Sequence, residues 1–451
     1  MDIKDLYGLF QSSAGVSTDS RNIRPGELFI GLKGENFDGG DYALKALSDG
    51  ALRAVVNAGS SAAASGNPGI IVVPDTLETL RQLARYHREN TFVGGRRLTV
   101  LGLTGTNGKT TTKNLITRVL SKKYRVTATE GNLNNDIGVP LSLLKIDSST
   151  ELAVIEMGAS HPDDIAHLVE VAEPDYGLIT NVGKAHLLGF GSFEGVKKAK
   201  GQLYDWVLAH GKAVFVNADD PVLASMAADR EGLETISYGI EYSGSVVLPS
   251  DPSHPFLRMA VPSGRPEKEG VETLIGIETH LVGSYNAANV MAAIAVGSFF
   301  GVGIEDAIAA VEEFVPENSR SQMMRTGSNT VIADAYNANP SSMAAALDNF
   351  SMVEAPSKIV LLGDMRELGG DSQKEHEAVV RRLETLSPDL ACLVGEEFAK
   401  AVASVGKAPW MRLVGTSDEL ASWLRENPVK DSVVLVKGSR GIRMEKAIEA
   451  L

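Results

Sequence analysis

The sequence predicts an α/β protein of three domains, and two observations lead to this prediction. The chain has 451 residues, more than one hydrophobic core usually supports. Short apolar stretches alternate with helix-like stretches along most of it, which is typical of mostly parallel sheets covered by helices on both faces. The pattern is broken by a loop of paired glycines and arginines at 90–97 and again near Pro316. We therefore expect domains at 1–95, 96–315 and 316–451.

The expected elements differ between the three domains. The N-terminal domain is expected to be a small α/β unit, with strands at 27–32, 53–57 and 70–74 and a helix at 77–89. The central domain is expected to contain a mostly parallel sheet, then an antiparallel flap and an apolar helix, with strands at 100–104, 125–129, 152–157, 176–182 and 212–217, the flap at 243–283 and the helix beginning near Asn286. The C-terminal domain is expected to be Rossmann-like, with strands at 330–336, 358–362, 390–394 and 433–436.

A glycine-rich loop ending in Lys-Thr-Thr follows the first central strand directly. Glycines allow successive backbone N–H groups to point at phosphate oxygens, a lysine adds positive charge, and a threonine hydroxyl can bind Mg²⁺. The loop is shorter than the usual phosphate-binding motif, because Leu103 stands where that motif has its first glycine. Gly-Lys-Thr also arises by chance in long chains, but the flanking strand and helix-like stretch favour function. We predict an ATP-using enzyme whose nucleotide contacts include Gly105, Thr106, Asn107, Gly108, Lys109, Thr110 and Thr111.

Composition and charge narrow the classes of partner. The formal net charge of −14 argues against a broad surface for nucleic acid or anionic membrane, since such surfaces need clustered Lys and Arg. The single cysteine, Cys392, excludes an intramolecular disulfide. Residues 1–10 lack the apolar core of an export signal, and the apolar stretch at 290–300 is too short to span a bilayer. We expect a cytoplasmic protein without membrane insertion.

Polar residues stand where central strands are expected to end. Glu156 follows one strand and His186 another, and Lys200 lies further along in a lysine-rich stretch. Ligands of doubly wound sheets collect at the carboxyl ends of strands, and a carboxylate with an imidazole there could hold Mg²⁺ beside phosphates. Taken alone, His186 is equally well explained as a structural histidine, and Lys200 is better explained as part of a solvated helix face.

Two stretches of the C-terminal domain carry polar side chains after expected strands. Residues 334–340 place an acid, an aromatic ring and two amides at a strand-to-helix junction, where they could face a nucleotide. The same residues suit an Asx turn and helix N-cap, which is an equally good explanation. Residues 437–440, Lys-Gly-Ser-Arg, could bind a carboxylate or phosphate or simply form a basic turn.

Together these motifs resemble the Mur ligase family over nearly the whole chain. The resemblance rests on residues 18–21, 31–34, 104–111, 131–140, 217–221, 286–289, 334–340, 362–369 and 437–440. Residues 131–140 and 362–369 direct it toward the members that add D-alanyl-D-alanine to a UDP-N-acetylmuramoyl-tripeptide. Such a resemblance implies ATP and Mg²⁺ as cofactors and a place in peptidoglycan synthesis, hence in cell-wall biogenesis, cell shape and cell division. It implies small-molecule partners, no nucleic acid, and a monomer.

The resemblance also implies roles for individual residues. The N-terminal domain would hold the uridine nucleotide, and the substrate-binding residues would be Ser20, Arg21, Asn134 and Asn135. The metal ligands would be Thr110 for a first Mg²⁺ and, for a second, Glu156, His186 and Lys200. Lys200 stands where the family carries a carbamylated lysine, which presents oxygens to the cation where an ammonium would repel it. The catalytic set would be Lys109, His186 and Lys200, and further ATP contacts would come from Asn286, Asn289, Arg320, Asp334 and Asn337.

The implied reaction is amide formation through an acyl phosphate, with release of ADP and phosphate. The alternatives are another Mur-type ligase, a folylpolyglutamate synthase, which shares the short phosphate loop, and a nucleotide-gated binding module without useful turnover. One departure from the family is Tyr285, since many relatives carry His at that position. An imidazole role there is therefore not expected in this chain.

Overall fold

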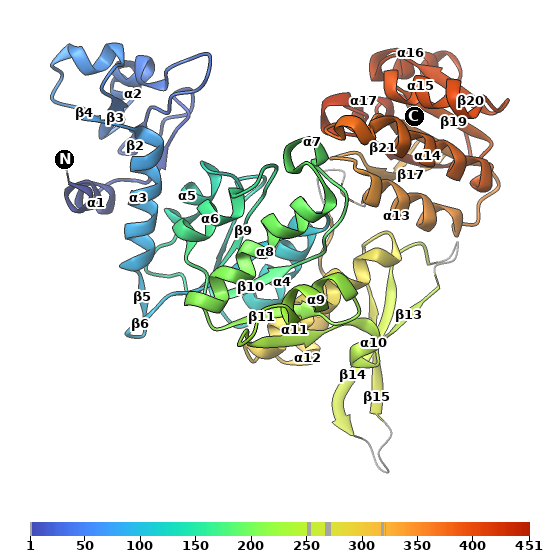
Figure 1. Cartoon of the computed structure of the whole chain (residues 1–451), viewed down its shortest axis with the longest axis horizontal. Helices are drawn as coiled ribbons and strands as arrows, with labels where there is room; N and C mark the ends of the chain where they lie inside the picture. Colours follow the sequence, from blue (N-terminus) through green and yellow to red (C-terminus); the bar gives the residue numbers. More distant parts are fainter. Residues whose placement is uncertain (1, 250–253, 267–271, 317–319, 321) are drawn as a thin grey trace.

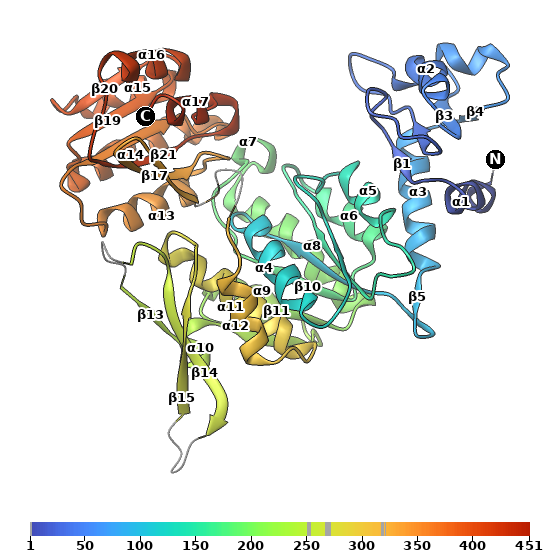
Figure 2. The same ribbon diagram turned by 180° about the vertical axis from the view of Figure 1, so that it is seen from behind.

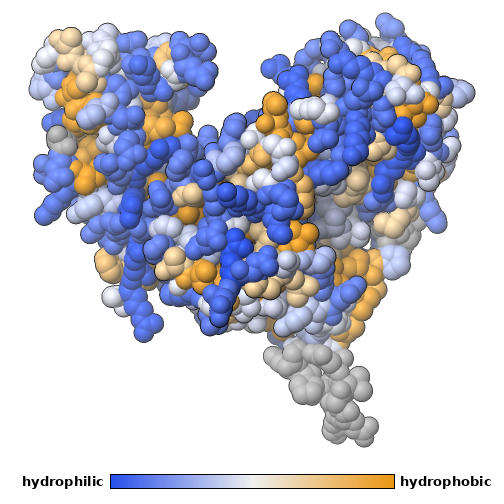
Figure 3. Space-filling view, viewed as in Figure 1, coloured by the Kyte–Doolittle hydropathy of each residue, from blue (hydrophilic) through white to orange (hydrophobic). Residues whose placement is uncertain are grey.

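The computed structural model describes residues 2–249, 254–266, 272–316, 320 and 322–451. Figure 1 shows three bodies in chain order, the N-terminal and C-terminal ones on either side of the central one, and Figure 2 shows them from behind. The space-filling surface is hollowed between the two outer bodies (Figure 3). The α/β architecture of three domains is confirmed, while the boundaries at 95 and 315 stay predictions. None of the described helices is long and apolar enough to cross a membrane.

A four-stranded parallel sheet in the order β1-β2-β3-β4 organises the N-terminal domain. Its elements are α1 (Ile3–Gln11), β1 (Val16–Ser17), β2 (Leu28–Ile30), α2 (Ala43–Ser48), β3 (Arg53–Asn57), β4 (Ile70–Val73) and α3 (Thr76–Glu89), with short 3₁₀ helices η1 (Gly39–Tyr42) and η2 (Ser61–Ser65). Leu28 and Ile30 pack in one apolar cluster, whereas Phe29 between them packs in another. This alternation is the period of two that a strand buried on both faces requires.

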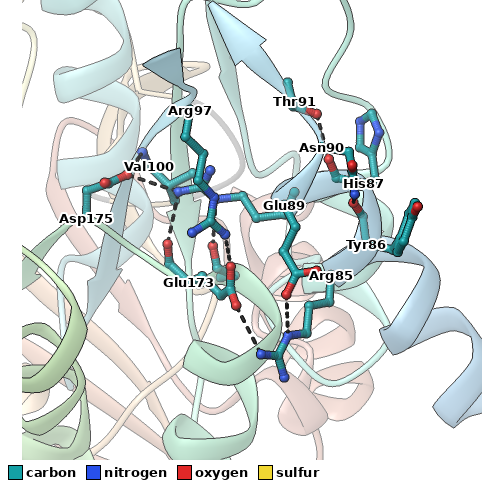
Figure 4. A network of polar contacts seen from close by, with 12 residues as sticks. Arg85, Tyr86, His87, Glu89, Asn90, Thr91, Arg97, Val100, Glu173 and Asp175 are labelled. Atoms are coloured by element: carbon teal, nitrogen blue, oxygen red, sulfur yellow. Dashed lines mark hydrogen bonds and ion pairs between the residues drawn. The ribbon is translucent and has the colours of Figure 1, made fainter. Parts of the chain in front are cut away.

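Helix α3 links the N-terminal domain to the central one through buried charge. Arg88, whose side chain is fully buried, donates to the carbonyl oxygens of Ala172 and Glu173 at 3.2 and 3.0 Å and to the Asp175 carboxylate at 3.0 Å. Arg85 pairs with Glu173 at 3.2 Å, and Figure 4 shows that Arg97 reaches the same carboxylate. Arg85 and Arg88 thus fix the end of α3 against the central domain, and Arg97 of the following hairpin meets the same carboxylate as Arg85.

The loop expected at 90–97 is a β-hairpin of β5 (Phe92–Val93) and β6 (Arg96–Arg97). Its turn residues, Gly94 and Gly95, have φ of 56° and 78°. Two consecutive positive φ angles suit the tight turns of hairpins and are strained for residues with a Cβ, so the paired glycines mark this turn.

The central domain holds a six-stranded parallel sheet in the order β12-β11-β10-β7-β9-β8. Its strands are β7 (Thr99–Thr104), β8 (Val126–Ala128), β9 (Leu152–Glu156), β10 (Tyr176–Ile179), β11 (Ala213–Asn217) and β12 (Thr235–Tyr238). Its helices are α4 (Lys109–Ser121), α5 (Gly138–Leu143), α6 (Asp164–Ala172), α7 (Leu187–Phe190), α8 (Phe193–His210), α9 (Pro221–Ala228), α10 (Ile240–Ser243), η3 (Ser284–Asn286), α11 (Ala287–Phe299) and α12 (Ile304–Glu312). The five expected strands are present, and β12 is an additional edge strand.

An antiparallel three-stranded sheet projects from the central domain (Figure 1), as the sequence predicts for 243–283. It consists of β13 (Val246–Leu248), β14 (Arg258–Pro266) and β15 (Glu272–Glu278). Parts of the expected flap, at 250–253 and 267–271, lie outside the described residues.

The C-terminal domain has a six-stranded sheet in the order β16-β17-β21-β18-β19-β20, parallel except for β16. Its strands are β16 (Gln322–Thr326), β17 (Asn329–Asp334), β18 (Lys358–Gly363), β19 (Leu390–Val394), β20 (Met411–Val414) and β21 (Val433–Lys437). Its helices are α13 (Pro340–Ser351), η4 (Gly369–Asp371), α14 (Ser372–Leu386), α15 (Glu396–Val405), α16 (Ser417–Glu426), η5 (Arg440–Ile442) and α17 (Glu445–Ile448). The four expected strands are present, and the two edge strands β16 and β20 are additional.

Candidate active site

The glycine-rich loop lies between the end of β7 and the start of α4, and the residues that follow neighbouring β10 hold it in place. Asn107 donates its backbone N–H to the Asn181 side chain at 2.9 Å, and its carbonyl accepts from the Thr180 hydroxyl at 2.6 Å. Gly105 must lack a side chain, because a Cβ there would lie 1.9 Å from the Thr180 hydroxyl oxygen. Gly108 caps α4 with φ of 76°, so the helix N-terminus and its free N–H groups face the loop.

The Lys109 ammonium lies against the loop itself. Its Nζ donates to the carbonyl oxygens of Gly105 and Thr106 at 2.8 and 3.2 Å. Burial lowers the pKa of Lys109, the Glu156 carboxylate opposes that shift, and the positive charge of Arg320 adds to it. A cation held among carbonyl oxygens close to another cation is well placed to receive an anion.

Glu156, at the end of β9, is almost completely buried, at 1% exposure. Its Oε1 accepts from the Asn134 amide at 2.8 Å and from the Thr110 hydroxyl at 3.2 Å, whereas its Oε2 is buried without a hydrogen-bond partner. A buried carboxylate oxygen left unpaired is costly unless a cation meets it. Asn135, the neighbour of Asn134, instead accepts from the backbone of Gly138 at 2.9 Å and so shapes the start of α5.

Lys200 is buried on α8, at 2% exposure, so the interpretation of this residue as part of a solvated helix face is wrong. Burial holds the pKa of Lys200 well below its usual range, nearby Lys109 lowers it further, and Asp164 opposes the shift. The sequence suggested exposure because Lys197 and Lys198 precede it closely, but Lys200 lies on the buried face of the helix.

His186 precedes α7 in a left-handed backbone conformation, with φ of 51°. Its Nδ1 pairs with the Glu367 carboxylate of the C-terminal domain. Burial lowers the pKa of His186, and Glu367 opposes that shift. Among the described residues, no three His, Cys, Asp or Glu side chains converge as a ready-made metal site.

Asn286 and Asn289 lie at the start of α11 beside the loop. Asn289 accepts from the Thr112 hydroxyl at 2.9 Å and donates to Asn286 at 2.9 Å, and Asn286 donates to the carbonyl of Val282 at 2.8 Å. A Cβ on Gly108 would lie 2.8 Å from the Asn289 side-chain oxygen. The amides therefore fix α11 closely against the glycine loop.

The C-terminal domain contributes charge and an aromatic ring after β17 and β21. Asp334 pairs with Lys437, whose Nζ also donates to the carbonyl of Asn337 at 3.3 Å. Arg320 stacks on the Tyr336 ring. Asn339 caps α13 by accepting from the backbone of Ser342 at 2.9 Å, so the N-cap interpretation holds for this residue.

A cavity of about 740 Å³ lies between the central and C-terminal domains. Most of the predicted site residues line it: Thr106, Asn107, Gly108, Lys109, Thr110, Thr111, Asn134, Asn135, Glu156, His186, Asn286, Asn289, Arg320, Asp334 and Asn337. Lys200 is not among the lining residues, although its charge lowers the pKa of His186 and the charge of Lys109 lowers the pKa of Lys200.

Ser20 and Arg21 lie elsewhere, in the N-terminal domain. Arg21 is highly exposed and pairs with Asp19 at 2.8 Å. Neither residue lines the cavity, so the structure does not bring them together with the other predicted residues.

Sequence reasoning missed the residues that join the domains. Asn339 donates to the side chain of Asn107 at 2.7 Å, and Lys184 pairs with Glu375 at 2.7 Å. The Glu367 carboxylate of the C-terminal domain likewise pairs with His186 of the central domain. The Asn-Pro pair at 339–340 signalled a helix cap, but nothing in the sequence signalled its contact with the phosphate loop.

Comparison with known proteins agrees with this geometry. Models of the Mur ligase family match three regions: the "Mur ligase family, catalytic domain" at 13–88, the "Mur ligase middle domain" at 103–297, and the "Mur ligase, glutamate ligase domain" at 319–440. A Bacillus subtilis protein named UDP-N-acetylmuramoyl-tripeptide–D-alanyl-D-alanine ligase is 34% identical, over 97% of this chain and 93% of its own length. The Escherichia coli protein of the same name is 31% identical, over 99% and 95%.

Solved structures give the same result. MurF from Acinetobacter baumannii superposes with a TM-score of 0.82 at 28% identity, covering 98% of this chain and 97% of that one. MurF from Thermotoga maritima in complex with ADP superposes with a TM-score of 0.81 at 27% identity and the same coverage. With three family models in chain order and relatives above 30% identity over nearly its full length, the chain belongs to the Mur ligase family.

Proposed function

We propose that this chain joins UDP-N-acetylmuramoyl-tripeptide to D-alanyl-D-alanine in an ATP-dependent reaction of peptidoglycan precursor synthesis. The substrates are those named for the relatives, and the proposal rests on one feature of this chain, the set of groups that face its cavity. The short phosphate loop, a buried carboxylate with an unpaired oxygen and cations from two domains all face one cavity. Enzymes that transfer phosphoryl groups from ATP use such combinations of phosphate-binding backbone, metal ligand and positive charge.

The reaction proceeds in two steps. The terminal carboxylate of the tripeptide attacks the γ-phosphorus of ATP, an oxygen–phosphorus bond forms, and ADP leaves. The dipeptide amine then attacks the acyl carbon, orthophosphate leaves with the bridging oxygen, and the amine loses a proton. Closure of the C-terminal domain over the cavity would keep water from the acyl phosphate.

In this proposal Lys109 and Arg320 bind the β- and γ-phosphates, and Asp334, Asn337, Asn286 and Asn289 surround the rest of the nucleotide. The residues present fit Mg²⁺, since the Glu156 Oε2 is an unpaired buried oxygen and the Thr110 hydroxyl lies beside the same carboxylate. When bound, Mg²⁺ would screen the charge of the triphosphate and polarise the γ-phosphoryl group. His186 would be free to serve a second ion once Glu367 releases it.

Carbamylation of Lys200 is part of the proposal. Burial and Lys109 both favour the neutral amine of Lys200, and a neutral amine adds to CO₂ to give a carbamate and a proton. The carbamate would bring negative charge to a place where Lys109 now brings only positive charge. This change of sign would let α8 contribute to the metal site.

The remaining assignments follow from the relatives and the fold. Ser20 and Arg21 would bind the uridine nucleotide in the N-terminal domain, and Asn134 and Asn135 would contact the tripeptide substrate. The product would feed cell-wall synthesis in the cytoplasm and through it cell shape and division.

The test is an ADP-release assay with a panel of acceptor and amine substrates. UDP-N-acetylmuramoyl-tripeptide with D-alanyl-D-alanine should give multiple turnovers that depend on both substrates and on Mg²⁺. Release of ADP with a folate and glutamate instead would favour a folylpolyglutamate synthase. ADP release that ignores the amine would favour a nucleotide-gated binding module.

A further inference from the structure

Two arginines of the C-terminal part of the chain share one aromatic ring. The guanidinium carbon of Arg320 lies 3.5 Å from the centre of the Tyr336 ring, and that of Arg440 lies 5.2 Å from it. Arg440 also donates to the Tyr336 hydroxyl at 3.1 Å. Tyr336 follows β17 and Arg440 follows β21, which are paired neighbours in the sheet. The ring is therefore fixed from the sheet side while Arg320 stacks on it.

Arg320 stands in surroundings that repel it. It lines the same cavity as Lys109, and its charge lowers the pKa of both Lys109 and Lys113. Before an anion arrives, these cations favour separation. A guanidinium at van der Waals distance from an aromatic face gains a compensating attraction of about 0.5–2 kcal/mol.

Tyr336 and Arg320 also border a second cavity. A second cavity of about 750 Å³ adjoins the first, and Arg320, Tyr336 and Arg440 line both. The second cavity is lined in addition by the carboxylate residues Glu130 and Glu445. Without the ring, Arg320 could turn toward these carboxylates and away from the phosphate loop.

We propose that Tyr336 is a positioning residue that holds the Arg320 guanidinium toward the phosphate loop, with Arg440 fixing the ring. The proposal rests on the proposed function in one respect, that the cavity receives the phosphates of ATP. Tyr336 then acts through Arg320: it selects the arginine conformation that meets the anion, and the nucleotide need not touch the ring.

The test measures nucleotide affinity by isothermal titration calorimetry with Mg²⁺-ATP and Mg²⁺-ADP on the full chain, without turnover. Tyr336→Leu should weaken binding about 2- to 30-fold, the range that a lost cation–π contact of this kind implies. Tyr336→Phe keeps the aromatic face and should retain most of the parent's affinity for the nucleotide. In the Arg320→Ala background, Tyr336→Leu should cause no further loss.

Trp423→Leu is the matched control, since Arg412 stacks on Trp423 at 4.3 Å in the same domain but neither residue lines the cavities. This variant should bind nucleotide like the parent. Unchanged affinity in Tyr336→Leu would overturn the proposal, and so would an equal loss with and without Arg320, which would indicate that the ring contacts the nucleotide directly. If Tyr336→Leu lowers nucleotide affinity only when Arg320 is present, but the chain never forms the amide, the positioning role is supported and the proposed function is refuted.

Discussion

The side-chain amide of Asn339 lies 2.7 Å from the side-chain oxygen of Asn107, across 232 positions of sequence. Asn107 belongs to the phosphate loop and Asn339 caps the first helix after β17, so this hydrogen bond joins the C-terminal domain to the loop. One asparagine thus serves the local fold and the contact between domains at the same time.

These two roles can be separated by substitution. Asn339→Ser retains a helix cap but is too short to reach Asn107, so turnover should fall several-fold while the melting temperature stays close to that of the parent. Asn339→Ala loses both roles, and its unfolding free energy should drop by a further ~1 kcal/mol. ADP release and thermal unfolding measure the two effects. Turnover of Asn339→Ser equal to that of the parent would show that the contact between domains contributes nothing to the reaction.

Glu156→Gln should weaken the binding of Mg²⁺ without weakening the fold. The substitution keeps the shape of the side chain but removes the charge from the buried, unpaired Oε2, which is costly in the absence of a cation. We expect the Mg²⁺ concentration for half-maximal turnover to rise at least about tenfold, a loss of ~1.4 kcal/mol, while the melting temperature in chelator stays the same or rises. A marked loss of stability in chelator would instead assign Glu156 a structural role.

Lys200→Ala should abolish most of the turnover, and short-chain carboxylates such as acetate should restore part of it by supplying the missing oxygens. In the parent enzyme, removal of CO₂ and bicarbonate should lower activity, more so as pH falls, because protonation of Lys200 removes the amine from which the carbamate forms. Lys198→Ala, an exposed position on the same helix, is the control and should retain activity. Full activity of unrescued Lys200→Ala would remove this residue from the site.

Arg88→Ala should destabilise the protein strongly. Asp175 keeps contacts with the backbone of Val100 at 2.9 Å and with Lys212 at 3.3 Å, but it would lose its buried partner. Removing one member of a buried ion pair typically costs about 3–5 kcal/mol. Arg85→Ala, which breaks a more exposed pair with Glu173, should cost only ~0–1 kcal/mol. Chemical denaturation measures the free energy of unfolding of both variants. Similar losses in the two would argue against α3 being fixed by Arg88.

The sequence predicts the parts of this molecule that local patterns determine. Strand β19 is apolar throughout and was expected at its observed bounds, because a strand buried on both faces reads as a continuous apolar run. The edge strands β12, β16 and β20 were not expected, since each contains partly exposed residues and no such run. The phosphate loop was recognisable because its glycines and lysine are adjacent in sequence.

Contacts between domains could not be predicted in this way. Glu367 and His186 are 181 positions apart, and no pattern of spacing joins them. The burial of Lys200 depends on which face of α8 packs against the sheet, and the neighbouring lysines obscured that face. Family resemblance implied roles for His186 and Lys200, and the structure supplied the pairing of His186 with Glu367 and the burial of Lys200.

The last prediction concerns the fate of one oxygen atom. If the tripeptide carboxylate attacks the γ-phosphorus, the acyl phosphate contains a bridging oxygen that came from the substrate. When the dipeptide amine attacks the carbon, that oxygen leaves with phosphorus. Tripeptide labelled with oxygen-18 in its terminal carboxylate should therefore yield orthophosphate carrying one labelled oxygen, which mass spectrometry detects, and the nucleotide product should be ADP.

The same experiment tests the amine substrate. D-alanyl-D-alanine should be required for net turnover, and single D-alanine should support little. A site built to bind the distal carboxylate of a dipeptide is too far from the reacting amine to bind the carboxylate of single D-alanine. Attack on the α-phosphorus would give AMP and pyrophosphate instead. Either AMP or unlabelled phosphate would mean that the carboxylate is activated by a different route, even in a chain with this fold.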